Sequence, residues 1–401
     1  MKHTFSLSIF ILLLSALFQA CQSNDEPTPE PVETYPLETP RSVLVYMVAN
    51  NNLGNEYSRY DVKDSIEMQA ALDTVKGLEG ELLVFRAPYK NTPVLLRLRP
   101  NQCADTLVTY SDPNFQCLSE SGMKQVLDDS RRFVKAKEHG LILWSHGTGW
   151  VQDGVEDVNS RLRSYGMDGS MKMNVTSLAS VLESGYNFDW LYFDCCYMNS
   201  IEVAYQLRNA VPLIVGSVTE LPAEGMPYHR NVPCFLKAGG ADLVQAARNT
   251  FEWYDSKEGS DRTCTMSVIE TKNLPALAAA VKEIYQKCDP SLPTNYTPQR
   301  FENVSVSSCK FFDLDNYLEA LCLDPQGTER FEGAQSALDN YRLAQSNAVR
   351  YNASTPLLWN SLYLTHCCGL STYILRTPAN VSYKNYDTLD WYSDVASNLN
   401  L

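Results

Sequence analysis

The sequence predicts an α/β protein built on a mostly parallel β-sheet that is flanked by helices. Short apolar runs rich in Val, Leu and Ile recur along the chain, and segments with apolar residues at helical spacing separate them. Apolar runs without polar alternation are typical of strands that are buried on both faces. Strands that alternate with helices in this way form parallel sheets, because the connecting helices cover the faces of the sheet.

Most of the predicted elements lie in the first 236 residues. The Val-rich run at 42–49 predicts the first buried strand, and Asn50, Asn51 and Asn52 break it. Gly140 is expected to end the second helix. Further strands are predicted at 81–87, 94–98, 141–144, 191–193 and 211–217, and helices at 57–72, 119–137 with Ser119 as N-cap, 175–185 and 200–209.

The rest of the chain continues this alternation less regularly. A helix at 242–254, a strand at 264–269 and a helix at 274–288 complete the expected core, which spans 41–290. Residues 291–401 are expected to form a C-terminal α/β extension packed against the sheet. Within it we expect helices at 311–321 and 329–348 and a strand at 370–375.

The N-terminus predicts export. Met1-Lys2-His3 is a basic start, and the apolar run at 9–18 is shorter than the about 20 residues needed to span a bilayer, as in a secretory signal. Ala20-Cys21 at its end resembles the lipobox of bacterial lipoproteins. This resemblance implies removal of a signal peptide at 1–20 and lipidation of Cys21. The alternative is an ordinary signal peptide followed by a chance cysteine.

Residues 21–40 are rich in Pro, Glu, Thr and Asp. Such a polar segment cannot bury enough surface to offset its ordering entropy, so we expect a disordered acidic tether. Together with the lipid, this predicts an exported bacterial lipoprotein that is anchored to a membrane. The protein would face either the periplasm or the outside of the cell.

The net charge of the chain indicates which classes of partner it can bind. The formal charge is −14, and it becomes −15 without residues 1–20, whose only charged side chain is Lys2. An acidic chain argues against a nucleic-acid partner, which is bound through its phosphates, and suits a basic partner.

The cysteine count bears on disulfide bonds. Of the twelve cysteines, eleven remain if Cys21 is lipidated. Eleven is odd, so at least one thiol is expected to stay unpaired.

Two predicted strands end in residues that can carry chemistry. The strand at 141–144 is followed by His146 in a Gly-flanked turn, and the strand at 191–193 is followed by Asp194-Cys195-Cys196. Ligands bind at the carboxyl ends of parallel strands. A cysteine also needs a base or a positive neighbour to form a thiolate. We therefore predict that the histidine and one of the two cysteines meet at this edge of the sheet.

The other histidines are weaker partners for the cysteine. His3 leaves with the signal peptide, and His139 is expected at a helix end, where a cation favours the helix dipole. His229 lies in an irregular stretch, and His366 is adjacent to Cys367.

Two motifs resemble the clostripain family of cysteine peptidases, within the caspase-like clan. They are LILWSHGTG at 141–149 and FDCCYMNSIEVAY at 193–205, and VGSVTELPAEGMPY at 215–228 and CGLSTYIL at 368–375 are similar to later family segments. His146 precedes Cys196 by 50 positions, close to the separation of about 50 in caspases. The resemblance implies a caspase-like fold and a cysteine endopeptidase.

The resemblance also implies roles for the site residues. His146 would accept the thiol proton, Cys196 would attack the peptide carbonyl, and the backbone N–H groups of Gly147 and Cys196 would form the oxyanion hole. Cleavage is expected after Arg, with Lys as an alternative, and a guanidinium needs an acidic pocket. Asp194 is the leading pocket residue by family position, unless it only organises the strand end. The weaker candidates are Glu220 and Glu224.

The choice between the two adjacent cysteines follows from the same motif. The family has alanine at the position of Cys195, and side chains alternate at a strand end, so only one of the two thiols can face the histidine. We expect Cys196 to be the nucleophile.

The family often matures by cleavage between its two motifs. The segment at 151–172 is predicted to be a loop, and it contains Arg161, Arg163 and Lys172. An enzyme with basic specificity could cut itself at these residues. The alternative is an exposed loop with ordinary basic side chains.

Other functions remain as alternatives. The first is a non-catalytic surface binding module that retains the peptidase fold. The second is a metal site, but its adjacent cysteines lack the usual spacing of zinc ligands. Its possible ligands are Cys195, Cys196, His366, Cys367 and Cys368. No cofactor is expected; calcium stays open, because acidic side chains could supply oxygen ligands outside any EF-hand pattern. They are Asp153, Glu156, Asp157 and Asp168.

Overall fold

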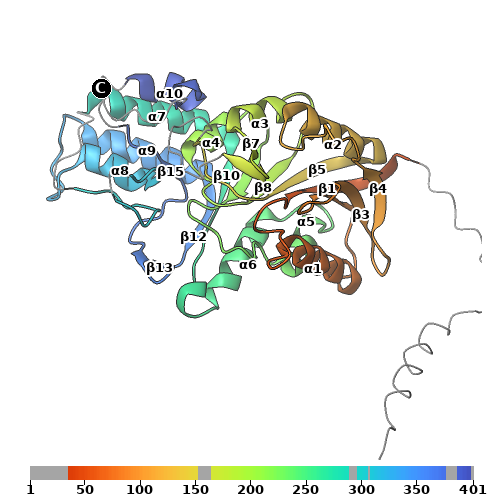
Figure 1. The fold of residues 1–401 in the computed structure, drawn as a ribbon. Coiled ribbons are helices and arrows are strands. Elements are labelled where there is room, and N and C mark those ends of the chain that lie inside the picture. The colour runs from red at the N-terminus through yellow and green to blue at the C-terminus, as the bar shows by residue number, and fades with distance from the viewer. Residues whose placement is uncertain (1–34, 152–163, 289–295, 306–307, 376–385, 399–401) are drawn as a thin grey trace, which may run out of the picture. The chain divides into compact units, whose positions relative to one another are not determined.

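A nine-stranded sheet forms the centre of the protein in the computed structural model, which describes residues 35–151, 164–288, 296–305, 308–375 and 386–398 (Figure 1). The strands of this sheet are β1 (Leu37–Val48), β2 (Glu81–Ala87), β3 (Val94–Leu98), β4 (Asp105–Thr109), β5 (Val134–Trp144), β8 (Trp190–Asp194), β9 (Leu213–Gly216), β10 (Thr265–Glu270) and β12 (Val349–Ser354). Their order is β12-β10-β9-β8-β5-β1-β2-β3-β4.

The centre of the sheet is parallel and its two edges are antiparallel. Strands β9, β8, β5, β1 and β2 run parallel to one another, whereas β10 and β12 on one edge and β3 and β4 on the other pair antiparallel. This confirms the predicted α/β class with a mostly parallel sheet flanked by helices.

Helices cover both faces of the sheet (Figure 1). Along β1, Val43, Val45 and Met47 pack against one layer of helices, and the alternate residues Leu44 and Tyr46 pack against the other. The first layer is α1 (Tyr60–Thr74), α5 (Tyr228–Phe235) and α6 (Leu243–Asp255). The second contains α2 (Glu120–Phe133), α3 (Val175–Leu182), α4 (Ile201–Gln206) and α7 (Leu274–Lys287), and its core continues into α8 (Leu314–Cys322), α9 (Ala334–Ala348) and α10 (Asp390–Asp394).

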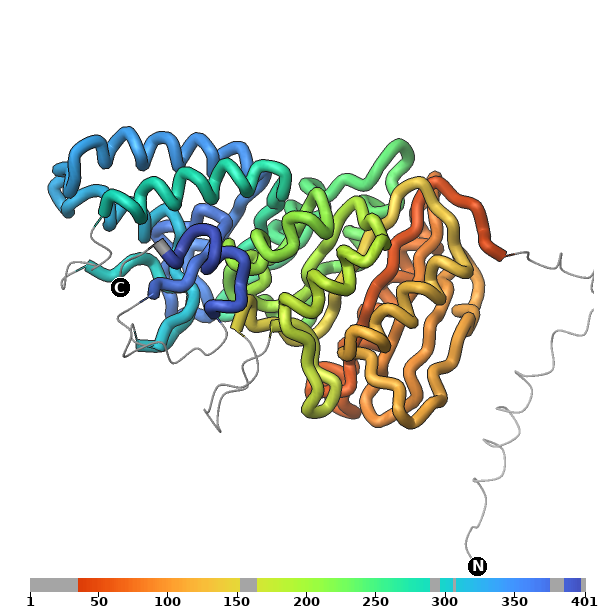
Figure 2. Tube along the Cα trace, turned by 90° about the horizontal axis from the view of Figure 1, so that it is seen from above, coloured from red at the N-terminus to blue at the C-terminus, as the bar shows by residue number. Residues whose placement is uncertain are grey.

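The C-terminal residues share the sheet and the core. Strand β12 pairs with β10, and α9 packs against α7. Two small antiparallel pairs complete this part: β11 (Phe312–Asp313) with β15 (Ser371–Thr372), and β13 (Leu357–Leu358) with β14 (Leu362–Tyr363). Figure 2 shows the blue C-terminal helices at the opposite end of this unit from the red and orange strands.

Several boundaries differ from those expected from the sequence. The helix predicted over 119–137 ends at Phe133, and β5 begins at Val134, because β5 pairs with β1 along nearly its whole length. His139 therefore lies within a strand rather than at a helix end. The expectation of a loop at 151–172 was wrong at its C-terminal end, where β6 (Tyr165–Asp168) and β7 (Met171–Met173) form a hairpin.

The N-terminal expectations fall largely outside the described residues. The signal peptide at 1–20, Cys21 and the tether up to residue 34 are not described. Residues 37–40, expected at the end of the tether, begin strand β1, and Leu37, Glu38 and Thr39 pair with β5. Among the described helices, none is long and apolar enough to cross a membrane.

Candidate active site

The two predicted chemical residues follow neighbouring parallel strands. Trp144, the last residue of β5, is opposite Asp194, the last residue of β8. His146 and Cys196 each lie two residues beyond this pair. Both line one cavity of about 310 Å³ at the carboxyl edge of the sheet. The structure therefore brings together the histidine and the cysteine that the sequence placed at this edge.

Gly147 allows the two strand-end turns to approach each other. A Cβ at this position would lie 2.6 Å from the Cys196 carbonyl oxygen and 2.9 Å from the Cys195 Cβ, so no larger residue fits. Gly147 also forms an isolated β-bridge with Tyr165. The two hydrogen bonds of this bridge use the amide of Thr148 and the carbonyl of His146, the two neighbours of Gly147. The Gly147 amide takes no part in that bridge, and its position beside residue 196 suits an oxyanion donor.

The two adjacent cysteines have different environments. Cys195 is buried, and its Sγ donates a hydrogen bond to the Leu143 carbonyl at 3.0 Å. Cys196 is only partly buried, and its Sγ accepts from the Leu221 amide at 3.4 Å. One thiol thus packs into the core on β5, while the other contacts the segment that follows β9.

The residue after Cys196 is strained. Tyr197 has a left-handed backbone with φ of 60°, which is unfavourable for a bulky side chain. Its ring stacks on Phe311 with a centroid distance of 4.6 Å, and its amide donates to the Thr219 carbonyl. Such strain persists only where the surroundings enforce it, as at functional sites.

The thiol of Cys196 resists ionisation in this environment. Burial raises its pKa to about 12, and the nearby carboxylates of Glu220 and Asp194 add to the shift, whereas the hydrogen bond with Leu221 opposes it. The thiolate is the nucleophilic form of cysteine. Nucleophilic chemistry here therefore requires a base that takes the thiol proton.

Asn52 orients His146, and sequence analysis treated it only as part of a strand break. The His146 Nε2 atom lies 2.7 Å from the Asn52 Oδ1 atom. An amide oxygen only accepts, so Nε2 carries the proton and Nδ1 is left as the basic nitrogen. The signal that could have identified Asn52 was its position in the chain, because it follows β1, which is the parallel neighbour of β5.

Asp194 forms a buried acidic wall of the cavity. Its carboxylate accepts hydrogen bonds from the Met226 amide at 3.0 Å and the Tyr228 hydroxyl at 3.1 Å. Burial raises its pKa to about 7, and these two donors limit the shift. The other two predicted pocket residues are both exposed, but only Glu220 lines the cavity, where it is hydrogen-bonded to Tyr197. Glu224 is not among the lining residues.

Trp359 is a second lining residue that sequence analysis missed. It lies at the turn between β13 and β14, has a left-handed backbone with φ of 50°, and is 38% exposed. Holding a bulky aromatic side chain in this conformation is unfavourable. Its position in the irregular C-terminal region gave no sequence signal.

The remaining predicted residues lie elsewhere. Arg161 and Arg163 are outside the described residues, as are Asp153, Glu156 and Asp157, whereas Lys172 lies on β7. The described residues hold no group of three or more metal-binding side chains, and the eleven described cysteines form no disulfide with one another.

A parallel sheet that brings a histidine and a cysteine together at its carboxyl edge defines a protein of the caspase-like cysteine peptidase class. The chain belongs to the clostripain family, because the sequence model of that family matches residues 45–396. It is therefore a cysteine peptidase of the C11 type.

Solved structures agree with this assignment. An inactive zymogen C11 protease from Parabacteroides distasonis is 28% identical, with a TM-score of 0.75 over 90% of this chain and 99% of that one. A secreted C11 cysteine protease from Bacteroides thetaiotaomicron, bound to an irreversible peptide inhibitor, is 27% identical, with a TM-score of 0.72 over 88% of this chain and 98% of that one. Comparison with curated proteins found no significant match.

Proposed function

We propose that this chain is an endopeptidase that cleaves after basic residues, Arg first and Lys as the alternative, by means of a Cys196–His146 dyad. The observation that carries the proposal is the shared cavity. Cys196, His146 and the buried carboxyl group of Asp194 line the same space of about 310 Å³. A nucleophile, a base and a pocket for a cationic side chain thus stand within one substrate-sized cavity.

The mechanism follows from the contacts of these residues. Asn52 holds Nε2 of His146, so Nδ1 takes the proton of the Cys196 thiol. The thiolate attacks the carbonyl carbon of the scissile peptide bond, and the Gly147 and Cys196 amides stabilise the oxyanion. His146 then donates its proton to the leaving amine. Water releases the acyl group in the second half of the reaction.

Asp194 gives the pocket its preference for basic residues. With a pKa of about 7, this carboxyl group is partly protonated in the empty cavity at neutral pH. An entering guanidinium favours the ionised form, and the pairing is strong because both groups are then shielded from water. Glu220 adds negative charge beside the thiol. Trp359 lines the cavity and is partly exposed, so it suits the apolar stem of a long basic side chain.

Self-processing between 151 and 164 is part of the proposal. Arg161 and Arg163 are the preferred sites, since Lys172 lies within the β6–β7 hairpin. The raised pKa of Cys196 suits a latent form of the enzyme. One similar structure is described as an inactive zymogen, which supports the same idea.

We further propose that the enzyme is exported and anchored at a membrane through a lipid on Cys21. The support is the sequence before residue 22 alone. Labelling cells with a radioactive fatty acid tests it: the wild type should carry label and a Cys21→Ser variant should not. Equal labelling of both would overturn the anchor.

The proposed chemistry is tested with protein lacking residues 1–21, as wild type, Cys196→Ala and Cys195→Ala. Each is incubated with fluorogenic peptides that end in Arg, Lys, Asp or Leu, and a gel follows the chain. Cleavage after Arg or Lys that is lost only with Cys196→Ala supports the dyad, and a split between 151 and 164 supports self-processing. Activity that survives in Cys196→Ala and is lost in Cys195→Ala would reassign the nucleophile. Failure of the wild type on every peptide, with reductant and calcium present, would favour a non-catalytic binding module.

A further inference from the structure

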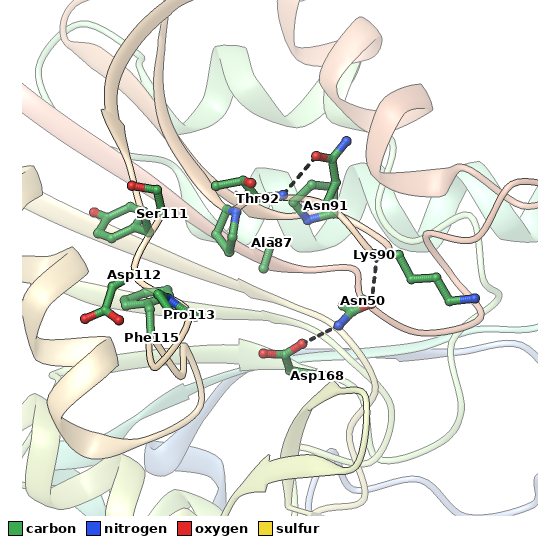
Figure 3. A pocket seen from close by; sticks show the side chains of 13 residues that line it. Asn50, Ala87, Lys90, Asn91, Thr92, Ser111, Asp112, Pro113, Phe115 and Asp168 are labelled. Carbon is green, nitrogen blue, oxygen red and sulfur yellow. Dashed lines mark hydrogen bonds between the residues drawn. The ribbon is translucent and has the colours of Figure 1, made fainter.

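A second cavity has a volume of about 430 Å³ and shares no lining residue with the candidate active site. Figure 3 shows the residues that line it. It opens beyond the ends of β1 and β2, the next two strands after β5 in the sheet. Asn50 and Asp168 form one side of it, and the segment at 110–113 with Phe115 forms the other. Asn50 is two residues before Asn52, which binds His146, so one short segment borders both cavities.

The cavity is built by a fixed set of polar contacts. The Asn50 side chain donates to Asp168 Oδ1 at 2.7 Å and accepts from the Lys90 amide at 2.9 Å. Lys90 has a left-handed backbone with φ of 49°, so its turn is held at a conformational cost. The Asp168 Oδ2 atom accepts from the thiol of Cys117 at 3.3 Å. These bonds connect the ends of β1, β2 and β6.

The charge of this cavity is negative and uncompensated. Within the described part of the chain, neither Asp168 nor Asp112 forms an ion pair, and both line the cavity. The one cationic lining residue is Lys90, whose Nζ lies 4.8 Å from the centre of the Tyr89 ring. Figure 3 shows its side chain directed away from the cavity. A cation supplied by a ligand would complete the site.

The direction of the substrate follows from the reaction. The histidine donates a proton to the leaving amine, so the polypeptide released first lies on the histidine side of the cysteine. In the sheet, Cys196 follows the end of β8, His146 follows the end of the neighbouring strand β5, and β1 and β2 are the next two strands. A leaving segment that continues across this edge reaches the second cavity.

The distance agrees with a peptide of ordinary length. Strands lie about 4.8 Å apart, so the way from β8 to the space between β1 and β2 is about 12 Å. An extended chain advances about 3.3 Å per residue, which corresponds to three or four residues.

We propose that the second cavity binds the substrate segment on the leaving side of the scissile bond, and that Asp168 receives a basic side chain about three or four residues beyond that bond. The inference rests on the proposed endopeptidase function and adds a second specificity site to it. Substrates with an acidic residue at this place are disfavoured by the two unpaired carboxylates.

Paired substrates test the proposal. Three peptides share one sequence up to the scissile Arg and carry Lys, Ala or Glu at both the third and the fourth position after it. Because the enzyme is also proposed to cleave after Lys, mass spectrometry follows only the cleavage at the Arg bond. A fourth substrate ends in a fluorogenic amide directly after Arg. For the processed wild-type enzyme, we expect kcat/KM to fall in the order Lys, Ala, Glu, with about a fivefold difference between Lys and Ala, the upper end for a partly exposed ion pair.

Asp168→Asn keeps the size of the side chain and removes the charge. We expect it to reduce the Lys-to-Glu ratio of kcat/KM to near one, whereas Asp339→Asn, a matched change on the exposed surface of α9, should keep the wild-type ratio. The ratio is measured on one sample, so a loss of folded enzyme cancels. Equal cleavage of the Lys and Glu peptides by the wild type, or an unchanged ratio in Asp168→Asn, overturns the inference. No cleavage of any substrate, the truncated amide included, overturns the proposed function, and the second site with it.

Discussion

The Nε2 atom of His146 lies 2.7 Å from the Oδ1 atom of Asn52, so a side chain after β1 fixes the orientation of a side chain after β5. The contact leaves Nδ1 as the only nitrogen of this imidazole that can accept a proton. It also ties the candidate base to the segment that borders the second cavity. The orientation of the base is thus set by a residue that has no acid or base chemistry of its own.

Asn52→Ala should lower kcat on an Arg peptide by about 100-fold with a smaller change in KM, because a misplaced base loses most of its effect. Steady-state kinetics on the processed enzyme measure both constants. Asn340→Ala on the exposed surface of α9 serves as the control. A kcat within twofold of wild type for Asn52→Ala would show that the contact has no role in catalysis.

The raised pKa of Asp194 predicts that the substrate specificity depends on pH. Burial raises its pKa to about 7, so the carboxyl group is neutral below that pH and ionised above it. The kcat/KM ratio between a peptide ending in Arg and one ending in the neutral isostere citrulline should therefore rise as pH increases through about 7. Asp194→Asn should abolish the rise. A ratio independent of pH in the wild type would remove Asp194 from the pocket.

The same shift has a consequence for stability. The folded-state pKa exceeds the ordinary value of 3.8, so the folded chain holds a proton that the unfolded chain releases. The contribution of Asp194 to stability is full below pH 3.8 and declines as pH rises to about 7. Thermal unfolding of wild type and Asp194→Asn at several pH values should show the variant gaining relative stability over this window. A constant difference would contradict the burial argument.

Gly147→Ala should reduce activity by about 100-fold while the protein stays folded, since the added Cβ would meet the Cys196 carbonyl oxygen and displace the oxyanion site. Gly77→Ala is the control for adding a methyl group without a contact: open space surrounds this glycine, and its positive φ adds a backbone cost that Gly147→Ala does not carry. Kinetics and circular dichroism are compared for both variants. Full activity of Gly147→Ala would exclude this turn from the active site.

Trp359→Ala should raise KM for Arg and Lys peptides by about tenfold with kcat nearly unchanged, because the apolar stem of the substrate loses contact area worth about 0.8 kcal/mol per CH₂ group. Tyr363→Ala changes an exposed aromatic side chain of the same hairpin outside the cavity lining and should leave KM as in wild type. Unaltered KM in Trp359→Ala would mean that the ring faces solvent rather than substrate.

Much of the sheet could be predicted from the sequence, because its central strands are short apolar runs. The predicted strands at 81–87 and 94–98 coincide with β2 and β3. The predicted helix extended to Lys137, which was wrong beyond Phe133. In the structure, the exposure of the side chains alternates along the first residues of β5, as in a strand. The short strands near the C-terminus depend on pairing partners far along the chain, which local pattern does not reveal.

The candidate site could be predicted only where chemistry and strand ends coincide. Apolar runs end at or just before His146, Cys196 and Asp194. Because the carboxyl ends of parallel strands lie at one edge of the sheet, the sequence was enough to predict that these residues meet there. Asn52 and Trp359 were missed for different reasons. An asparagine after a strand usually marks a turn, and a lone tryptophan usually belongs to a core, so neither residue type signals a site by itself.

The order of the strands gives a cut between 151 and 164 an unusual outcome. Every strand on the β5 side of the sheet, from β5 to β4, precedes the cut, and every strand from β8 to β12 follows it. The cut would thus produce two polypeptides that meet along the β5–β8 pair, with the imidazole on one and the thiol on the other. Catalysis would then require both fragments, and separately produced halves would be inert alone and would regain activity only on association.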